Sequence, residues 1–159
     1  MNPAVAGGLL IDTNLLVLLA VGTVNLHRVE KFKRTRQYSK ADYALLRRVI
    51  EGYKPLYTVP HVLTEVSNLT DLSGAERQGA RAVLKEMISV LSEESISSGG
   101  ASDHKLYEKL GLADAAIGKA ARTHGCTVLT DDLDLYLRLS NEKVKVYNFT
   151  HLRAQQWRL

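Results

Sequence analysis

The stretch Leu9-Leu10-Ile11-Asp12-Thr13-Asn14 decides the fold. Three apolar residues in a row predict a short buried strand, and the polar residues directly after them end it. The apolar run at residues 15–21 predicts a helix, with Thr13 or Asn14 as its N-cap, because their side chains accept hydrogen bonds from the free amides of a first turn. An aspartate directly after a strand core tends to be partly buried, which marks Asp12 as a candidate functional residue.

The alternation of short apolar strands with helices continues along the chain. Further strands are predicted at residues 56–59, 126–130 and 143–147, a loop or poor edge strand at 92–100, and helices at 40–51, 61–69, 103–110, 114–124 and 133–140. Ser39 and Ser102 are predicted helix caps, and Ser73 forms a capping box with Glu76. This order predicts an α/β fold, a three-layer α/β/α sandwich around a mainly parallel sheet, because right-handed crossovers place helices on both faces.

The charge of the chain is unevenly distributed. Its 159 residues fit one domain, placed at residues 1–159, and 45% hydrophobic with 24% charged residues excludes a disordered chain. Residues 28–48 hold eight basic and two acidic residues, a net of +6, whereas the remaining 13 basic and 15 acidic residues sum to −2. Such a basic segment is suited to polyanions, although a solvated helix face has the same composition.

Cysteine content and hydropathy bear on the compartment. Cys126 is the single cysteine, which excludes an internal disulfide framework and a cysteine-based metal cluster. The apolar run at residues 15–21 differs from a signal sequence because no Lys or Arg precedes it and polar residues interrupt it. It is also shorter than the ~18 apolar residues that a membrane span requires. We therefore expect a cytoplasmic protein without membrane association.

Four acidic residues stand out against apolar surroundings: Asp12, Glu65, Asp114 and Asp132. Ligands of parallel α/β sheets bind beyond the carboxyl ends of the strands, which is where Asp12 and Asp132 fall. Clustered carboxylates repel one another, so such a cluster persists when a cation is bound in it. Oxygen ligands without cysteine favour Mg²⁺ or Mn²⁺, and such a metal indicates phosphoryl chemistry.

Each carboxylate also has a purely structural explanation. Asp114 in the first turn of a helix is favoured by the helix dipole. Asp131 or Asp132 suits the N-cap of the helix that begins near residue 133, and Glu65 suits a helix surface. Asp12 is the hardest to explain in this way. The four together carry more weight than any one of them.

In this order and spacing, the residues resemble the PIN-domain nucleases, most closely the VapC-type toxins of VapBC toxin–antitoxin pairs. The resemblance rests on residues 10–14, on the helical Glu65, and on residues 114–117 and 130–132. It implies that an acidic quartet binds Mg²⁺ or Mn²⁺ and catalyses the reaction: Asp12, Glu65, Asp114 and Asp132. It implies further that polar residues orient ligands or water, with one additional acid: Thr13, Asn14, Thr130 and Asp134.

The implied activity is hydrolysis of RNA phosphodiester bonds by a toxin that has an antitoxin partner and forms a homodimer. Substrate contacts are expected in the basic segment: Lys31, Lys33, Arg34, Arg36 and Lys40. Phe32 and Tyr38 in the same segment are open to stacking on bases. Two alternatives remain at this point. One is a PIN-type nuclease with an RNA-processing or DNA-directed role and no antitoxin, and the other is a nucleic-acid-binding module with a vestigial site.

Overall fold

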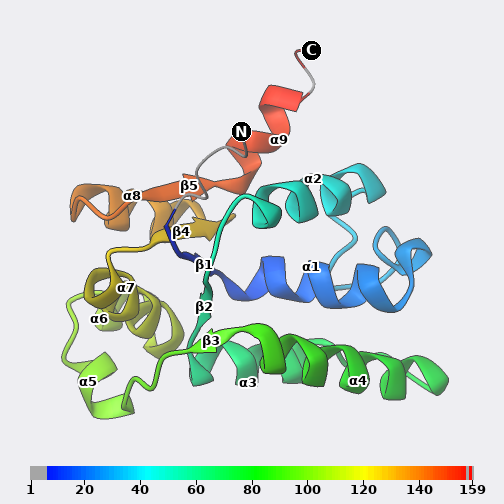
Figure 1. The fold of residues 1–159 in the computed structure, drawn as a ribbon, viewed down its shortest axis with the longest axis horizontal. Helices are drawn as coiled ribbons and strands as arrows, with labels where there is room; N and C mark the ends of the chain where they lie inside the picture. The colour runs from blue at the N-terminus through cyan, green and yellow to red at the C-terminus, as the bar shows by residue number, and fades with distance from the viewer. Residues whose placement is uncertain (1–6, 157, 159) are drawn as a thin grey trace.

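The computed structural model describes residues 7–156 and residue 158, so residues 1–6, 157 and 159 of the expected domain lie outside the described part. Its centre is a five-stranded sheet in which all neighbouring strands run parallel (Figure 1). The strands are β1 (Leu9–Ile11), β2 (Leu56–Thr58), β3 (Ser92–Glu93), β4 (Thr127–Thr130) and β5 (Val146–Asn148). Their order is β3-β2-β1-β4-β5, which confirms the predicted parallel α/β sheet.

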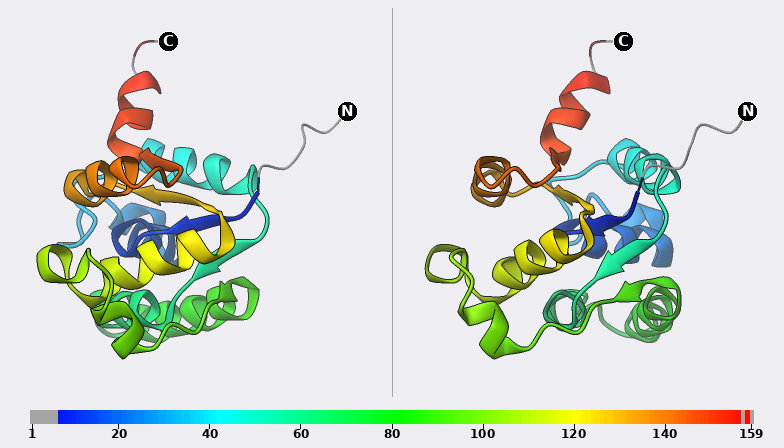
Figure 2. Two further views of the ribbon diagram at one scale, coloured as in Figure 1. Left: turned by 90° about the vertical axis from the view of Figure 1, so that its left-hand side faces the viewer. Right: turned by 60° about the vertical axis from the view of Figure 1, so that its left-hand side comes forward.

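Helices cover both faces of this sheet. They are α1 (Thr13–Val24), the 3₁₀ helix η1 (Leu26–Arg28), α2 (Lys40–Glu51), α3 (Pro60–Leu69), α4 (Ala75–Val90), α5 (Ser98–Ser102), α6 (Tyr107–Leu110), α7 (Leu112–His124), α8 (Leu133–Asn141) and α9 (Phe149–Gln156). Figure 2 shows α1 and α2 on one side of the strands and α7 and α8 on the other. The predicted three-layer arrangement is therefore confirmed.

The direction in which strands are added reverses between β1 and β4. From β1 the chain adds β2 and β3 on one side, and it later returns to add β4 and β5 on the other. Leu9 of β1 is accordingly paired with Leu56 of β2 and with Thr127 of β4. A parallel sheet opens a crevice at such a reversal, outside the carboxyl ends of the two strands. Asp12 follows β1 and Asp132 follows β4, so both lie at this edge.

The core is built around β1 and α1. All three residues of β1 are fully buried, and α1 has buried residues on all sides. A helix that is apolar on all sides must be buried on all sides, and α2, α3 and α4 contribute to this burial by packing against α1. The apolar run at residues 15–21 is therefore core. No helix in the described part of the chain combines the length and the apolar character needed to cross a membrane.

Local polar groups decide where the helices begin, and the sequence predicted only some of them. Ser39 caps α2 as expected, in a capping box with Asp42. Asp12 takes the place expected of Thr13 or Asn14 and caps α1 by accepting from the Thr13 amide, 2.7 Å away. The capping box of Ser73 with Glu76 is wrong. Gly74 precedes α4 without a side-chain cap, and the Glu76 carboxylate instead accepts from the Arg28 side chain.

Most predicted elements differ from the observed ones only near their ends, but two differ by several residues for identifiable reasons. The helix predicted at residues 103–110 is replaced by α5 and α6, because Ser97 rather than Ser102 supplies the cap and the chain turns at His104. The strand predicted at residues 143–147 begins only at Val146. Lys143 has a φ of 61°, a left-handed conformation that is incompatible with a strand, and makes a turn after α8.

Gly22 sets the close approach of α1 and α2. A Cβ at Gly22 would lie 2.3 Å from the ring of Tyr43. We expect Gly22→Ala to lower the free energy of unfolding by about 1–3 kcal/mol, because the ring must move. Gly79→Ala on α4 is the matched control, since its Cβ would meet only Val24 at 3.4 Å, and it should gain up to about 1 kcal/mol of helix propensity. Urea denaturation measures both, and equal stability of the two variants would contradict this packing.

Candidate active site

An acidic pocket of about 200 Å³ opens at the edge of the sheet where β1 and β4 end. Four separate parts of the chain supply its polar lining. The β1–α1 junction contributes Asp12, Thr13 and Asn14, α3 contributes Glu65, α7 contributes Asp114, and the β4–α8 junction contributes Asp132. The four carboxylates singled out from the sequence therefore line one pocket, although they are far apart along the chain.

Asp12 is the most buried of these carboxylates, with 6% of the residue exposed. One of its oxygens accepts from the Thr13 amide, and the other accepts from the Thr130 hydroxyl at 2.5 Å. The pKa of Asp12 is raised to about 6, because the effects of burial and of the nearby charges of Asp131 and Asp132 outweigh the two hydrogen bonds, which lower it. The side chain thus caps α1 and lines the pocket at the same time.

The Thr130 hydroxyl connects the two strand ends. It donates to Asp12 and accepts from the backbone amide of Asp132 at 3.0 Å, so both of its hydrogen-bonding roles are defined. The Asp132 carboxylate in turn accepts from the amide of Leu135 at 3.0 Å and caps α8. Both strand-end aspartates are therefore N-caps whose side chains are held by backbone amides, which gives the pocket two rigid walls.

Glu65 and Asp114 enter the pocket from helices. Glu65 is exposed on α3, and its carboxylate accepts from the Thr13 hydroxyl at 2.9 Å. Asp114 lies in the first turn of α7 and is partly buried. The pKa of the Asp114 carboxyl is raised to about 8, mainly by burial and in addition by the negative charges of Asp12, Asp132 and Glu65. The four carboxylates of the pocket therefore disfavour one another's charged forms.

Asp131 has a different environment from Asp132. The sequence alone does not show this difference, because it arises from contacts with distant residues. The Asp131 carboxylate accepts from the Tyr38 hydroxyl, and the amide of Asn14 lies 3.5 Å away. Burial and the Asp131 charge raise the pKa of the Tyr38 hydroxyl, which therefore stays protonated and donates. The two adjacent aspartates after the strand are visible in the sequence. Their neighbours in the sequence do not show which of them contacts a tyrosine 93 residues earlier.

Tyr38 is buried inside the protein, with 2% exposed, so its open role in base stacking is excluded. Its ring packs edge-on against Phe149 and lies beneath the Arg153 guanidinium, 5.4 Å from the ring centroid. Arg153 also pairs with Asp42 at 2.9 Å and thereby joins α9 to α2. Phe32, the other aromatic residue left open, is half-buried and packs against the core.

The remaining predicted residues lie outside the acidic pocket. Asp134 is exposed in the first turn of α8 and does not line the pocket. The proposed substrate-binding residues are all exposed: Lys31, Lys33, Arg34, Arg36 and Lys40. Part of the charge of the basic segment is neutralised, because Lys33 pairs with Asp71 at 2.9 Å and Arg28, at the start of the same segment, pairs with Glu76 at 2.9 Å.

The donor chemistry of the pocket fits a hard divalent cation, because its ionisable side chains are all carboxylates that repel one another. Among the residues that the structure describes, however, no group of three or more His, Cys, Asp or Glu side chains converges closely enough to hold a metal ion as it stands. The four carboxylates share the pocket without meeting at one point within it.

Comparison with protein-family models matches residues 9–139 to the PIN domain. The match spans most of the chain, from β1 to α8, and includes all four carboxylates of the pocket. The protein therefore belongs to the PIN domain family, whose members are in general nucleases that use divalent metal ions. No curated protein matches the chain.

The raised pKa of Asp114 predicts a pH-dependent stability. Its folded-state pKa of about 8 exceeds the ordinary 3.8, so the folded state retains the proton longer and stability falls as the pH rises from about 4 to 8. In EDTA at pH 8.5, Asp114→Asn should raise the free energy of unfolding by about 1–2 kcal/mol. This gain is smaller than the free energy equivalent to the whole pKa shift, because water screens the charge of a partly exposed group. At pH 4 the variant should match the wild type.

Thermal unfolding at the two pH values measures this effect. Glu86→Gln removes an exposed carboxylate from α4 and is the control, for which we expect no comparable gain. An Asp114→Asn variant that is no more stable than the wild type at pH 8.5 would show that burial and neighbouring charges do not disfavour the ionised form of Asp114 in the free protein.

The partly buried hydrogen bond from Tyr38 to Asp131 gives a second prediction. Tyr38→Phe keeps the ring and removes the donor to a carboxylate, so we expect it to lower the free energy of unfolding by about 1.5–3 kcal/mol. Tyr43→Phe is the matched control, because that hydroxyl bonds the neutral Thr23 hydroxyl at 3.0 Å, and its loss should cost about 0.5–1.5 kcal/mol. Denaturant titration ranks the two, and a larger loss for Tyr43→Phe would refute the assignment.

Proposed function

We propose that the protein is a metal-dependent endoribonuclease, a single PIN domain that acts as the toxin of a toxin–antitoxin pair. The observation that carries the proposal is the acidic pocket, where carboxylates from four separate segments gather at the strand reversal of the sheet. Burying like charges together is unfavourable unless a cation offsets them. The nuclease function common to the family gives that cation a role.

In this proposal Asp12, Asp114 and Asp132 hold Mg²⁺ or Mn²⁺, and Glu65 orients the attacking water or a second ion. When bound, such a cation polarises the scissile phosphate, lowers the pKa of a bound water and offsets developing negative charge. Thr130 fixes the orientation of Asp12 by its hydrogen bond, and Thr13 does the same for Glu65. Such fixed orientation matters because a misplaced ligand loses affinity for the metal.

A protein partner is supported by the apolar residues around the pocket. Leu112, two residues before Asp114, is 37% exposed, and Leu133, directly after Asp132, is 55% exposed. An antitoxin or a second copy of the chain that covers these side chains would gain from their burial. The cytoplasm and the RNA preference are parts of the same proposal, which rest on the resemblance to VapC-type toxins.

The decisive test is cleavage of end-labelled single-stranded RNA, and of DNA of the same sequence, in Mg²⁺, Mn²⁺ or EDTA. We expect RNA cleavage that EDTA abolishes. Asp12→Asn and Asp132→Asn should each lose more than about 100-fold in rate, beyond the usual cost of losing an outer metal-site contact. Both should still fold, because asparagine caps helices as well as aspartate does.

Asp134→Asn is the matched control, since Asp134 neighbours Asp132 but does not line the pocket, and its rate should stay close to that of the wild type. Cleavage in EDTA, or full activity of the Asp12 and Asp132 variants, would refute the mechanism. Cleavage of DNA alone would favour the DNA-directed alternative. Binding without cleavage by the wild type would favour a binding module with a vestigial site.

A further inference from the structure

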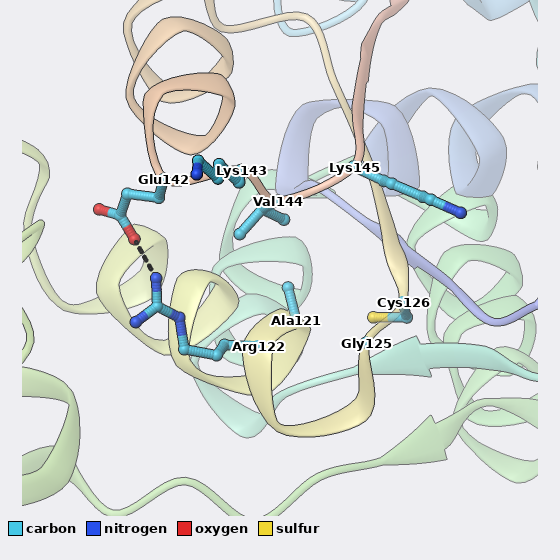
Figure 3. A pocket seen from close by; sticks show the side chains of 8 residues that line it. All are labelled: Ala121, Arg122, Gly125, Cys126, Glu142, Lys143, Val144 and Lys145. Carbon is cyan, nitrogen blue, oxygen red and sulfur yellow. Dashed lines mark ion pairs between the residues drawn. The ribbon is translucent and has the colours of Figure 1, made fainter.

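A second hollow lies at the opposite end of the sheet, before β4 and β5 begin. One pocket of about 270 Å³ is lined by Arg122, Glu142, Lys143 and Lys145, among others, and Figure 3 shows these side chains around it. A neighbouring pocket of about 300 Å³ is lined by Lys105, Arg138 and again Glu142. Because the two pockets share Glu142, we call them together the Glu142 groove.

The Glu142 groove is strongly basic. Its lining has one acid, Glu142, and five basic residues: Lys105, Arg122, Arg138, Lys143 and Lys145. They come from the α5–α6 turn, α7, α8 and the turn before β5, so the sequence shows no basic run here. Outside residues 28–48 the chain is slightly acidic, which makes this concentration of positive charge a product of the fold.

Glu142 forms ion pairs with two of these basic residues, Lys105 and Arg122, at distances longer than a hydrogen bond. Its side chain is only 6% exposed. The carboxylate lies 3.5 Å from the Lys105 ammonium, 3.7 Å from an Arg122 nitrogen and 4.0 Å from the ring of His104. Oε2 has no hydrogen-bond partner among the described residues. One buried carboxylate therefore brings two of the cations together and leaves most of their hydrogen-bonding capacity unused.

Helix-end stabilisation explains only part of this arrangement. Arg122 and Arg138 lie in the last turns of α7 and α8, where positive charge stabilises a helix. Lys105, Lys143 and Lys145 lie outside the helices, and the first of these is 66% exposed on its side chain. Exposed amines that surround a hollow are suited to an anion from solution.

Two helices, α7 and α8, begin at the acidic pocket and end at the Glu142 groove. Asp114 is in the first turn of α7 and Arg122 in the last, eight residues later, which is about 12 Å along the helix axis. Phosphates of one strand are about 3.4 Å apart along the axis of a stacked double helix and farther apart in an extended single strand, so a few nucleotides cover this length. A nucleic-acid strand with one phosphate in the acidic pocket can therefore reach the groove.

We infer that the Glu142 groove binds phosphates of the nucleic-acid strand that the acidic pocket cleaves, within a few nucleotides of the scissile bond. This inference rests on the proposed function. It adds a second contact surface that is distinct from the basic segment at residues 28–48. The groove provides affinity for the strand, whereas the acidic pocket provides the chemistry.

Binding in EDTA tests the groove separately from cleavage. The probe is a fluorescein-labelled single-stranded RNA, and its anisotropy is measured over a series of KCl concentrations. Each phosphate contact adds about 0.7 to the slope of log K against log salt, so the double variant Lys143→Gln, Lys145→Gln should reduce the slope by about 1.4. The control double variant Arg81→Gln, Lys85→Gln on exposed α4 should leave it unchanged.

Glu142→Gln provides a result of opposite sign, because removal of the one acid should tighten RNA binding. A purely structural ion network predicts no change or weaker binding for this variant. If it fails to fold by circular dichroism, the exposed lysine variants still decide. An unchanged slope for the lysine double variant, no RNA binding by the wild type, or equal competition by polyglutamate would overturn the inference. Altered binding without any cleavage by the wild type would uphold the groove and refute the proposed function.

Discussion

The hydrogen bond from the Thr130 hydroxyl to the Asp12 carboxylate is the contact on which the acidic pocket depends. It joins the carboxyl ends of β1 and β4, the two strands between which the sheet reverses direction. The same hydroxyl accepts from the Asp132 amide, so one side chain holds both strand-end aspartates. The parallel pairing of Leu10 with Val128 keeps the two ends level, and the remaining site residues are arranged around them.

Sequence reasoning succeeded where local signals and tertiary packing agree. The strand at Leu9–Ile11 and the helix at Lys40–Glu51 have the predicted bounds, because an apolar run and a Ser39 cap specify them without help from distant residues. The acidic residues were found for a related reason. An aspartate after a strand core is conspicuous among apolar neighbours, and the reversal of strand order in the sheet accounts for the shared pocket of Asp12 and Asp132.

Contacts between distant segments account for what the sequence did not predict. Glu76 was assigned to a capping box, but the nearby Arg28 guanidinium binds its carboxylate instead. Tyr38 was considered for stacking on bases because it lies in the basic segment, but folding buries its ring in the core and places its hydroxyl against Asp131. The Glu142 groove belongs to the same class, because charges spread over 41 residues from Lys105 to Lys145 converge only in three dimensions.

The packing of Arg153 on Tyr38 gives the C-terminal helix a thermodynamic connection to the acidic pocket. Arg153 of α9 holds the ring whose hydroxyl bonds Asp131, and Asp131 is adjacent to Asp132. Linkage between sites is reciprocal. A molecule that binds α9 and changes the free energy of this contact also changes the affinity of the β4–α8 junction for its ligand, and occupancy of the acidic pocket changes the affinity of α9 by the same factor.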